Sequence, residues 1–405
     1  MHAIRFHYRP VNYLWIRYAA RRRPALAVGP SGCIRLDEVE PPALPGPEWL
    51  RIETTLSGIC GSDISAVTAH DSFTLEPFGA FPFTFGHENI GRVIEAGSAA
   101  GEWTVGDRVA VNPMLSCVQR GLEPVCAPCA RGEYGLCRRT DAGIVGKGPM
   151  IGYSPATGGG WSPSFLAHRT QLHPLGSLND DVAVLTDPFA ATLRAVLLNP
   201  PAPDDTVLII GAGTIGVLLV KALRLTGWTG PVAVVARYGF QRQMAERAGA
   251  GPIFGGRDEA FAWAASLPEA RDYRPTLAPR FIEGGPSLVY DTVGSEGSLG
   301  QALALVRENG RLVLVGSAAK LAADWTRVWY RQITISGVFA YGLMPFEGRR
   351  MDIYEAALQL MHRDGLGELG MLTHVYPLVD YRTAITTALD KRGQSSVKVA
   401  FRPNG

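Results

Sequence analysis

The sequence predicts an α/β protein of two domains, one of which contains a parallel β-sheet. The first observation is length: the chain has 405 residues, whereas a single hydrophobic core rarely grows beyond about 250 to 300 residues. The second is the segment 206–235, in which a short apolar run, a glycine-rich turn, an apolar-periodic stretch and a second apolar run follow one another. This order predicts strand, tight turn, helix and strand, the repeating unit of a doubly wound parallel sheet.

The glycine-rich turn has the GxGxxG spacing of a dinucleotide-binding loop, formed by Gly211, Ala212, Gly213, Thr214, Ile215 and Gly216. Gly211 permits the tight turn, Gly213 lets a pyrophosphate approach the backbone, and Gly216 lets the helix pack against the strand. The N-terminus of the following helix attracts phosphate charge. A glycine turn without a ligand is the alternative, but the flanking strands favour a dinucleotide-binding (Rossmann) domain.

The end of the second predicted strand favours NADP over NAD. Domains specific for NAD usually place an acidic residue about 20 positions after the last glycine, where it binds the ribose hydroxyls. This sequence has Ala236 there, followed by Arg237, whose guanidinium can pair with a 2′-phosphate, and Arg242 on the next helix could assist. The alternative role of Arg237 is to cover the adenine ring of NAD.

Later segments of this domain continue to alternate. We predict strands at 288–291 and 311–315, with a helix at 296–307 between them. Gly316 and Ser317 follow the second of these strands, at the edge where open α/β sheets hold their ligands. Residues 255–285 are rich in proline, arginine and glycine, and the sequence suggests no function for them.

The composition excludes several classes of protein. Lys and Arg number 39 against 37 Asp and Glu, and this net charge of +2 is too balanced for a nucleic-acid-binding protein. No run of about 18 apolar residues indicates a membrane span, and the N-terminus lacks the apolar core of a signal peptide. We therefore expect a cytoplasmic protein that acts on small molecules. Four of the six cysteines are clustered, which favours metal binding over disulfides.

The N-terminal region is predicted to contain strands at 1–9, 33–39 and 49–55. Between the first two strands, residues 13–23 are basic and partly amphipathic. We expect a surface element whose apolar side packs inward, and a helix on a membrane surface is the alternative. Near the C-terminus the sequence predicts helices at 349–363 and 381–391 and a closing strand at 397–401.

Three residues have side chains that zinc commonly binds. Cys60, His87 and Glu88 would supply sulfur, nitrogen and oxygen, and three protein ligands with one open position make a catalytic zinc site. Taken singly, Cys60 could be an inert core thiol and His87 a hydrogen-bonded buried histidine. The residues around them decide between these alternatives.

Several short motifs occur in a fixed order along the chain: GICGSD at Gly58–Asp63, GHENIG at Gly86–Gly91, GDRV at Gly106–Val109 and the glycine-rich loop at Gly211–Gly216. Together they resemble the zinc-dependent medium-chain dehydrogenase/reductase family, which includes alcohol, polyol and threonine dehydrogenases. The resemblance implies a GroES-like, β-rich catalytic domain made of residues 1–187 and 341–405. The Rossmann domain, residues 188–340, would be inserted between these two parts.

The resemblance also assigns the catalytic zinc ligands. Cys60 and His87 would bind the metal. Asp187, in the place of the family's further ligand, is the candidate for the third position, and Glu88 is the alternative. Asp63 resembles the residue that hydrogen-bonds the ligating histidine and fixes its tautomer.

The resemblance assigns only the first step of proton transfer. Ser62 would accept the first proton, but the histidine that ends the relay in many relatives is replaced here by Ser65. The proton would then leave through water, Ser65 or His70.

A second group of cysteines predicts a structural zinc site. Cys117, Cys126, Cys129 and Cys137 would close a tetrahedral site with no open position. The last three have the family's spacing, but eight residues separate Cys117 from Cys126 where two are usual, which predicts a bulging loop within a lobe at about 113–140. The alternative is a cluster that has lost its metal. We therefore expect two zinc ions per chain.

The resemblance implies an oxidoreductase that moves a hydride between an alcohol or carbonyl substrate and NADP or NAD, with zinc polarising the substrate oxygen. The alternatives are an NADPH-dependent carbonyl reductase of the same fold and a non-catalytic, zinc-stabilised scaffold. A homo-dimer or homo-tetramer is expected from the family. The sequence leaves the substrate open, and Trp161 could line the pocket or pack in the core. Phe339–Gly342 resembles a loop that lies against the nicotinamide.

Overall fold

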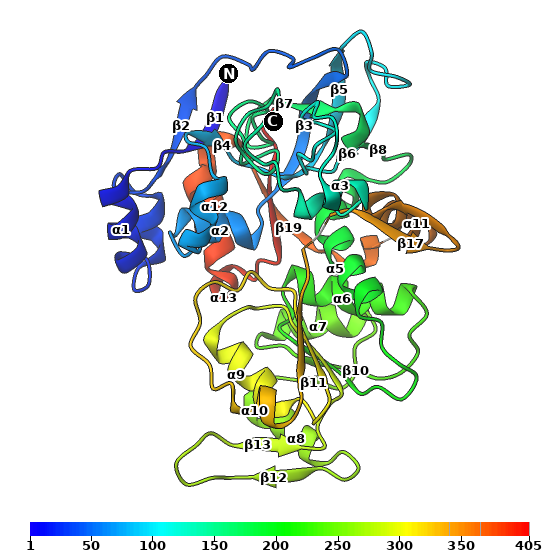
Figure 1. Ribbon diagram of the computed structural model, residues 1–405. Coiled ribbons are helices and arrows are strands. Elements are labelled where there is room, and N and C mark those ends of the chain that lie inside the picture. Colours follow the sequence, from blue (N-terminus) through cyan, green and yellow to red (C-terminus); the bar gives the residue numbers. More distant parts are fainter. Residues whose placement is uncertain (340, 365, 405) are drawn as a thin grey trace. The chain divides into compact units, whose positions relative to one another are not determined.

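The computed structural model describes residues 1–339, 341–364 and 366–404 (Figure 1). The chain divides into two compact units. The first combines Met1–Asp187 with Tyr341–Gly405, and the second is the single stretch Pro188–Ala340. The two ends of the chain therefore build one unit, and the other is inserted between them.

The inserted unit contains a parallel sheet whose strands, within the described residues, lie in the order β11-β10-β9-β14-β15-β16. Their bounds are β9 (Val207–Ile210), β10 (Val232–Val235), β11 (Ile253–Phe254), β14 (Leu288–Asp291), β15 (Arg311–Leu314) and β16 (Thr334–Gly337). All neighbouring pairs are parallel. Counted along the chain this is the doubly wound order 3-2-1-4-5-6 of the Rossmann fold. The two strands predicted within the segment 206–235 and those predicted at 288–291 and 311–315 are confirmed.

Helices connect these strands: α6 (Thr214–Leu225), α7 (Gly239–Arg247), α8 (Arg257–Ala265), α9 (Glu296–Leu305) and α10 (Thr326–Tyr330). The segment 255–285, for which the sequence suggested no role, forms α8 and an antiparallel hairpin of β12 (Arg271–Tyr273) and β13 (Phe281–Glu283). The apolar side chains of β9, β14 and α9 are buried together, which places the core of this unit between the sheet and its helices.

The first unit is built on antiparallel sheets. In the described part of the chain, one sheet has the order β19-β20-β3-β5-β6-β8, with β7 also pairing with β3, and a smaller one has the order β2-β1-β4. Their bounds are β1 (His2–Phe6), β2 (Ile34–Glu38), β3 (Trp49–Gly58), β4 (Phe83–Thr84), β5 (Glu88–Ala96), β6 (Arg108–Val111), β7 (Ser164–His168), β8 (Leu172–Pro174), β19 (Leu372–Tyr376) and β20 (Lys398–Phe401). Because β20 pairs with β3, the C-terminal end completes the sheet that the N-terminal part begins.

Short helices fill the rest of the first unit: α1 (Pro10–Ala19), η1 (Pro24–Val28), α2 (Gly61–Val67), η2 (Phe73–Phe78), α3 (Ala127–Ala130), η3 (Tyr134–Leu136), η4 (Arg169–Gln171), α4 (Asp180–Ala183), α11 (Ile353–Arg363), η5 (Leu366–Leu369), η6 (Leu378–Asp380), α12 (Tyr381–Leu389) and α13 (Lys391–Gln394). The helix α5 (Thr186–Leu198) runs across the boundary at 187/188. No helix of the described residues is long and apolar enough to cross a membrane.

One predicted helix, 349–363, is wrong over its first four residues. Arg349–Asp352 is strand β18, paired with β17 (Leu343–Phe346), and the helix α11 begins only at Ile353. Glu347 and Gly348 have φ of +47° and +80°, so the chain turns back at this point, and the Asp352 side chain then caps the helix by accepting from Tyr354 N–H.

One cluster of aromatic residues lies in the core of the first unit. Trp161, Phe85 and Phe401 are buried, and the Trp161 ring lies 4.9 Å from each of the other two ring centroids. Trp161 therefore packs, and it donates from Nε1 to the carbonyl of Gly58 at 3.4 Å.

Candidate active site and metal centres

Cys60 is placed by the end of a strand and the start of a helix. β3 ends at Gly58, and Cys60 is the residue before α2. The Cys60 N–H donates to Asp63 Oδ2 at 2.9 Å, so the carboxylate in the first turn fixes the entry to the helix. Gly58 must lack a side chain, because a Cβ there would lie 2.1 Å from Glu88 Oε2.

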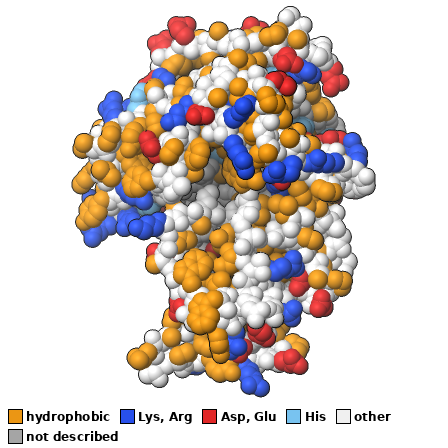
Figure 2. Space-filling model, viewed as in Figure 1, with side chains coloured by type: hydrophobic (Ala, Val, Ile, Leu, Met, Phe, Trp, Pro, Cys, Tyr) orange, Lys and Arg blue, Asp and Glu red, His pale blue; other side chains and the backbone are white. Residues whose placement is uncertain are grey.

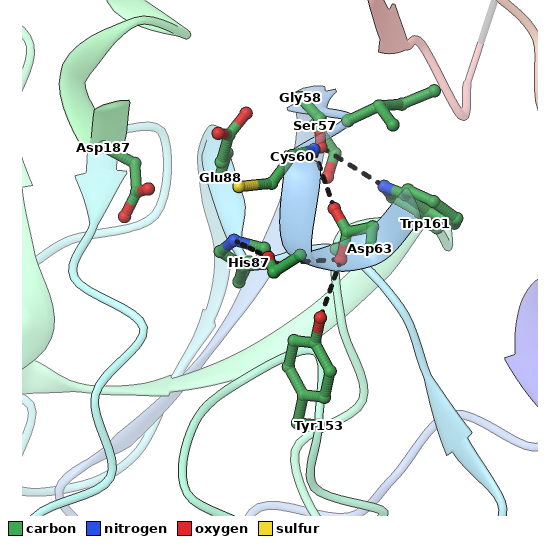
Figure 3. Close-up of polar contacts among 12 residues, drawn as sticks. Ser57, Gly58, Cys60, Asp63, His87, Glu88, Tyr153, Trp161 and Asp187 are labelled. Carbon is green, nitrogen blue, oxygen red and sulfur yellow. Dashed lines mark hydrogen bonds and ion pairs between the residues drawn. The ribbon is translucent and has the colours of Figure 1, made fainter. Parts of the chain in front are cut away.

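His87 and Glu88 reach the same place through the neighbouring strand. Glu88 is the first residue of β5, and the antiparallel register pairs it directly with Gly58. Strand pairing thus brings together residues that are far apart in the sequence. The ligand atoms of Cys60, His87 and Glu88 all lie within 4.8 Å of one another (Figure 3). A thiol, an imidazole and a carboxylate in a largely buried position form a donor set that suits zinc.

Asp63 holds the histidine from behind. His87 Nδ1 lies 3.3 Å from Asp63 Oδ1, and the same oxygen accepts from Tyr153 Oη at 3.2 Å. Burial alone would lower the pKa of His87, but Asp63 and Cys60 outweigh it and raise that pKa well above its usual value. With Nδ1 against a carboxylate, Nε2 is the nitrogen left for a metal.

Asp187 does not join the cluster of Cys60, His87 and Glu88. It lies in the first turn of α5, where its Oδ1 accepts hydrogen bonds from Tyr341 Oη at 2.9 Å and from Tyr354 Oη. Burial is the main cause that raises the pKa of Asp187 above its usual value. Figure 3 draws Asp187 apart from the other three side chains. The expectation that Asp187 is the third ligand is therefore not supported by this geometry, because two tyrosine hydroxyls hold the short carboxylate.

Glu88 has its own partner in Lys398. The two side chains are 1% and 2% exposed, and Lys398 Nζ contacts Glu88 Oε2 and donates to the carbonyl of Ile59 at 3.3 Å. Burial would lower the pKa of Lys398, but Glu88 outweighs it and raises that pKa. The positive charge of a buried ion pair thus lies directly behind the carboxylate of the cluster.

Of the residues expected to move protons, Ser62 contacts a side chain of the cluster, whereas His70 contacts Thr68. Ser62 Oγ is 3.5 Å from His87 Nε2, at the nitrogen that faces the cluster. His70 lies beyond the C-terminus of α2, where its Nδ1 contacts Thr68 Oγ1 at 2.9 Å. Burial, followed by Arg21 and Arg17, lowers the pKa of His70.

The four clustered cysteines come together as the sequence predicts. The sulfur atoms of Cys117, Cys126, Cys129 and Cys137 lie within 4.8 Å of one another. Two of the separations are 3.7 Å, between Cys117 and Cys137, and 4.0 Å, between Cys126 and Cys137. Tetrahedral coordination with Zn–S bonds of about 2.3 Å requires sulfur separations of about 3.8 Å. The four thiols therefore fit a zinc ion, and all are free thiols here.

Local hydrogen bonds prepare Cys126 as a ligand. Burial would raise the pKa of Cys126, but the backbone N–H groups of Arg138 and Cys129 and the neighbouring thiols lower it to about 6. A thiol with a lowered pKa is readily deprotonated, which is the form that binds metal.

The long spacing between Cys117 and Cys126 is accommodated around one buried arginine. Arg120 is fully buried, and its guanidinium donates to the carbonyls of Leu115, Ala142, Gly146 and Gly148. The extra residues therefore form an ordered loop, fastened to the segment that follows the cysteine lobe.

The glycine-rich loop has the shape that its sequence predicts. Gly211, at the end of β9, has φ of +101°, which favours glycine. A Cβ at Gly216 would lie 1.9 Å from the carbonyl oxygen of Gly211, so the helix can approach the strand only without a side chain there. Gly213 precedes the first residue of α6, and the half-buried Thr214 and Ile215 form its first turn.

The other predicted cofactor residues lie at the same ends of the strands. Ala236 follows β10 and is buried, whereas Arg237 and Arg242 are exposed. A Cβ at Gly316 would lie 2.7 Å from the backbone N of Gly294, so the chain segments after β14 and β15 approach closely there, and Ser317 is exposed. Ala340, within the loop Phe339–Gly342, lies outside the described residues.

Two family models match the chain. The model described as the alcohol dehydrogenase GroES-like domain matches residues 46–177, and the model described as zinc-binding dehydrogenase matches residues 214–363. The chain belongs to the zinc-type medium-chain dehydrogenase/reductase family. The predicted fold, a GroES-like domain with a Rossmann domain, is thereby confirmed.

Members of this family with assigned names are similar over most of their length. Sorbitol dehydrogenase of Bacillus subtilis (strain 168) is 26% identical, covering 91% of this chain and 95% of the relative. D-arabinitol dehydrogenase 1 of Uromyces fabae is 25% identical, covering 87% and 89%. A solved structure of a Sinorhizobium meliloti 1021 protein with bound NADP is 25% identical, with a TM-score of 0.69 and coverage of 91% and 95%. The protein described here is therefore an oxidoreductase of the alcohol and polyol dehydrogenase type.

Sequence reasoning missed the residues that hold the carboxylates of this dehydrogenase. Lys398, Tyr341 and Tyr354 lie far along the chain from the residues they contact. Lys398 did carry a signal, because a lysine inside the otherwise apolar closing strand at 397–401 needs a buried partner. The two tyrosines carried none.

Proposed function

We propose that this protein is a zinc-dependent alcohol dehydrogenase that uses a nicotinamide cofactor and acts on a small polyol. The observation that carries the proposal is the cluster of Cys60, His87 and Glu88 within 4.8 Å. The similarity to sorbitol and D-arabinitol dehydrogenases supports a substrate with neighbouring hydroxyls.

Cys60, His87 and Glu88 would hold the catalytic zinc, and Cys117, Cys126, Cys129 and Cys137 a second, structural one. Bound zinc supplies a Lewis acid for the substrate oxygen, and the nicotinamide accepts or donates the hydride. The side chains have separate tasks. Asp63 fixes the ring of His87, and Lys398 balances the charge of Glu88. Ser62, whose Oγ lies at His87 Nε2, is placed to take the proton of the substrate hydroxyl.

We further propose NADP as the preferred cofactor. Arg237 and Arg242 are exposed after β10 and on α7, and the buried Ala236 leaves the position of the usual carboxylate without charge. We also propose that the enzyme works in the cytoplasm. We propose that it forms a homo-dimer or homo-tetramer, and sedimentation velocity would test this oligomeric state.

The proposed function is tested by a turnover screen of polyols and the corresponding carbonyl compounds, with NADP and NAD side by side. We expect turnover with NADP to exceed that with NAD. Arg237→Ala should lower kcat/KM for NADP by about 10- to 100-fold, because a charge-assisted hydrogen bond is lost, and should leave NAD nearly unaffected. Equal rates with both cofactors would remove the argument from Arg237. No turnover with any of these compounds would favour a non-catalytic scaffold.

A further inference from the structure

The helix α1 belongs to a segment inserted between two paired strands. β1 and β2 form an antiparallel ladder that ends at Phe6 and Ile34, and His7 N–H donates to the carbonyl of Cys33 at 2.7 Å. The chain between them leaves the sheet and forms α1 and η1. One side of α1 packs inward through Tyr13, Ile16 and Ala19, as the sequence predicts.

The opposite side of α1 is also apolar, and it faces solvent. Val11, Leu14, Trp15 and Tyr18 are 81%, 58%, 51% and 62% exposed. They follow the spacing i, i+3, i+4, i+7, which places them along one face of the helix. A helix that is apolar on both sides is normally covered on both. Packing against the first unit therefore explains the apolar residues on the inner side of α1 but not those on its outer side.

A neighbouring segment extends this face. Phe73, Leu75 and Phe78 of η2 are exposed. Arg17 joins the two elements, because its guanidinium lies 4.6 Å from the Phe73 ring centroid and donates to the carbonyls of Ala69 and Asp71 at 2.7 and 2.9 Å. We define the α1 surface by these seven exposed apolar residues, Val11, Leu14, Trp15, Tyr18, Phe73, Leu75 and Phe78.

Positive charge surrounds the α1 surface. The first 36 residues contain seven arginines and no aspartate or glutamate, although the whole chain is nearly balanced. Arg21, Arg22 and Arg23 are exposed directly after α1, and Arg22 donates to Tyr18 Oη at 3.2 Å. Glu76 is the acidic residue within η2. Figure 2 shows hydrophobic side chains with Lys and Arg side chains beside them at the left, where Figure 1 draws α1.

We propose that the α1 surface docks the protein on a lipid surface with anionic headgroups. Tryptophan, tyrosine and leucine on one helix face, with arginines beside them, are the composition of helices that lie in the membrane interface. A second copy of this chain fits less well, because it would bring a further cluster of arginines and no carboxylate from its own first 36 residues. Lipid headgroups offer both an apolar layer and the opposite charge.

The first test is sedimentation of the full chain with vesicles. We expect binding to vesicles of equal parts phosphatidylcholine and phosphatidylglycerol, weaker binding at high salt, and little binding to phosphatidylcholine alone. Equal binding to both kinds of vesicle, or to neither, would overturn the proposal.

Variants locate the binding. Leu14→Ser with Trp15→Ser should weaken binding to the anionic vesicles about tenfold or more, because two apolar side chains no longer enter the interface. Arg21→Gln with Arg22→Gln and Arg23→Gln should weaken it on the order of 100-fold. All five positions are exposed, so the thermal midpoint should not change.

Matched controls separate this surface from general stickiness and charge. Trp329→Ser removes a tryptophan that is 71% exposed on α10, and Arg257→Gln, Arg271→Gln and Arg402→Gln remove three exposed charges elsewhere. These controls should bind vesicles like the wild type. Equal losses in control and test variants would contradict the proposal. So would a wild-type dimer that Leu14→Ser with Trp15→Ser dissociates while vesicle binding is unchanged, since a second copy would then cover the surface.

Discussion

At the scale of single residues, the two carboxylates near the proposed zinc site differ in their partners. Glu88 pairs with Lys398 and lies with Cys60 and His87, whereas Asp187 accepts hydrogen bonds from two tyrosines. Both carboxylates are buried. The carboxylate of Glu88 therefore lies with the thiol and the imidazole, whereas that of Asp187 is hydrogen-bonded to the two tyrosine hydroxyls.

Lys398→Met should lower the free energy of unfolding by about 3 to 5 kcal/mol, because it leaves the buried Glu88 without its positive partner. Denaturation by urea measures the change. The exposed Lys320→Met is the control and should stay within about 0.5 kcal/mol of the wild type. A similar small effect in both variants would show that the ion pair does not matter for stability.

Asp71 should make stability depend on pH. Burial, with a contribution from Asp63, raises the pKa of Asp71 from 3.8 to about 7, although Arg17 opposes the shift. The folded protein therefore binds this proton more tightly than the unfolded chain does. The contribution to stability is complete below a pH of 3.8 and is lost as the pH rises through about 7.

Asp71→Asn removes this charge, so it should raise the free energy of unfolding at about pH 8 by on the order of 2 kcal/mol, with a smaller effect at about pH 5.5. Urea denaturation at both pH values measures the difference. Asp258→Asn, at an exposed carboxylate, should change stability little at either. A gain for Asp71→Asn that is larger at the lower pH would contradict the assigned direction.

At the scale of elements, the cysteine lobe contains an ordered loop as well as the proposed structural zinc site. Arg120 satisfies four backbone carbonyls around the loop between Cys117 and Cys126. Arg120→Met should leave these carbonyls without donors and destabilise the protein by about 3 kcal/mol or more.

The same change should speed the loss of the zinc proposed for the cysteine lobe to a chelator, which can be followed with a chromogenic zinc indicator. Arg138→Met, at an exposed arginine next to Cys137, serves as the control. Unchanged zinc release in Arg120→Met would show that the loop does not hold the site together.

Elements defined by local chemistry could be predicted, and those defined by distant contacts could not. The loop from Gly211 to Gly216 and the turn at Cys60 require particular residues at particular backbone positions, so their sequences report them. The strand Arg349–Asp352 looked helical because its partner, β17, and the turn at Glu347 determine its conformation.

At the scale of the whole molecule, the proposed active site is assembled from both ends of the chain. Lys398 and Glu88 are 310 residues apart in the sequence, and Tyr354 and Asp187 are 167 apart. Motifs identified Cys60 and His87, because each belongs to a short recognisable pattern. Pairing of β20 with β3 brings in Lys398, and nothing near Lys398 in the sequence names its partner.

The most direct test of this account is the zinc content of three forms of the protein, purified in parallel. We predict two zinc ions per chain in the wild type, one in Cys60→Ser and two in Asp187→Asn, because in the proposed catalytic site Glu88, and not Asp187, is the third ligand with Cys60 and His87. Cys60→Ser should also lose turnover while it keeps the zinc of the cysteine lobe. Two zinc ions in Cys60→Ser, or one in Asp187→Asn, would contradict the account.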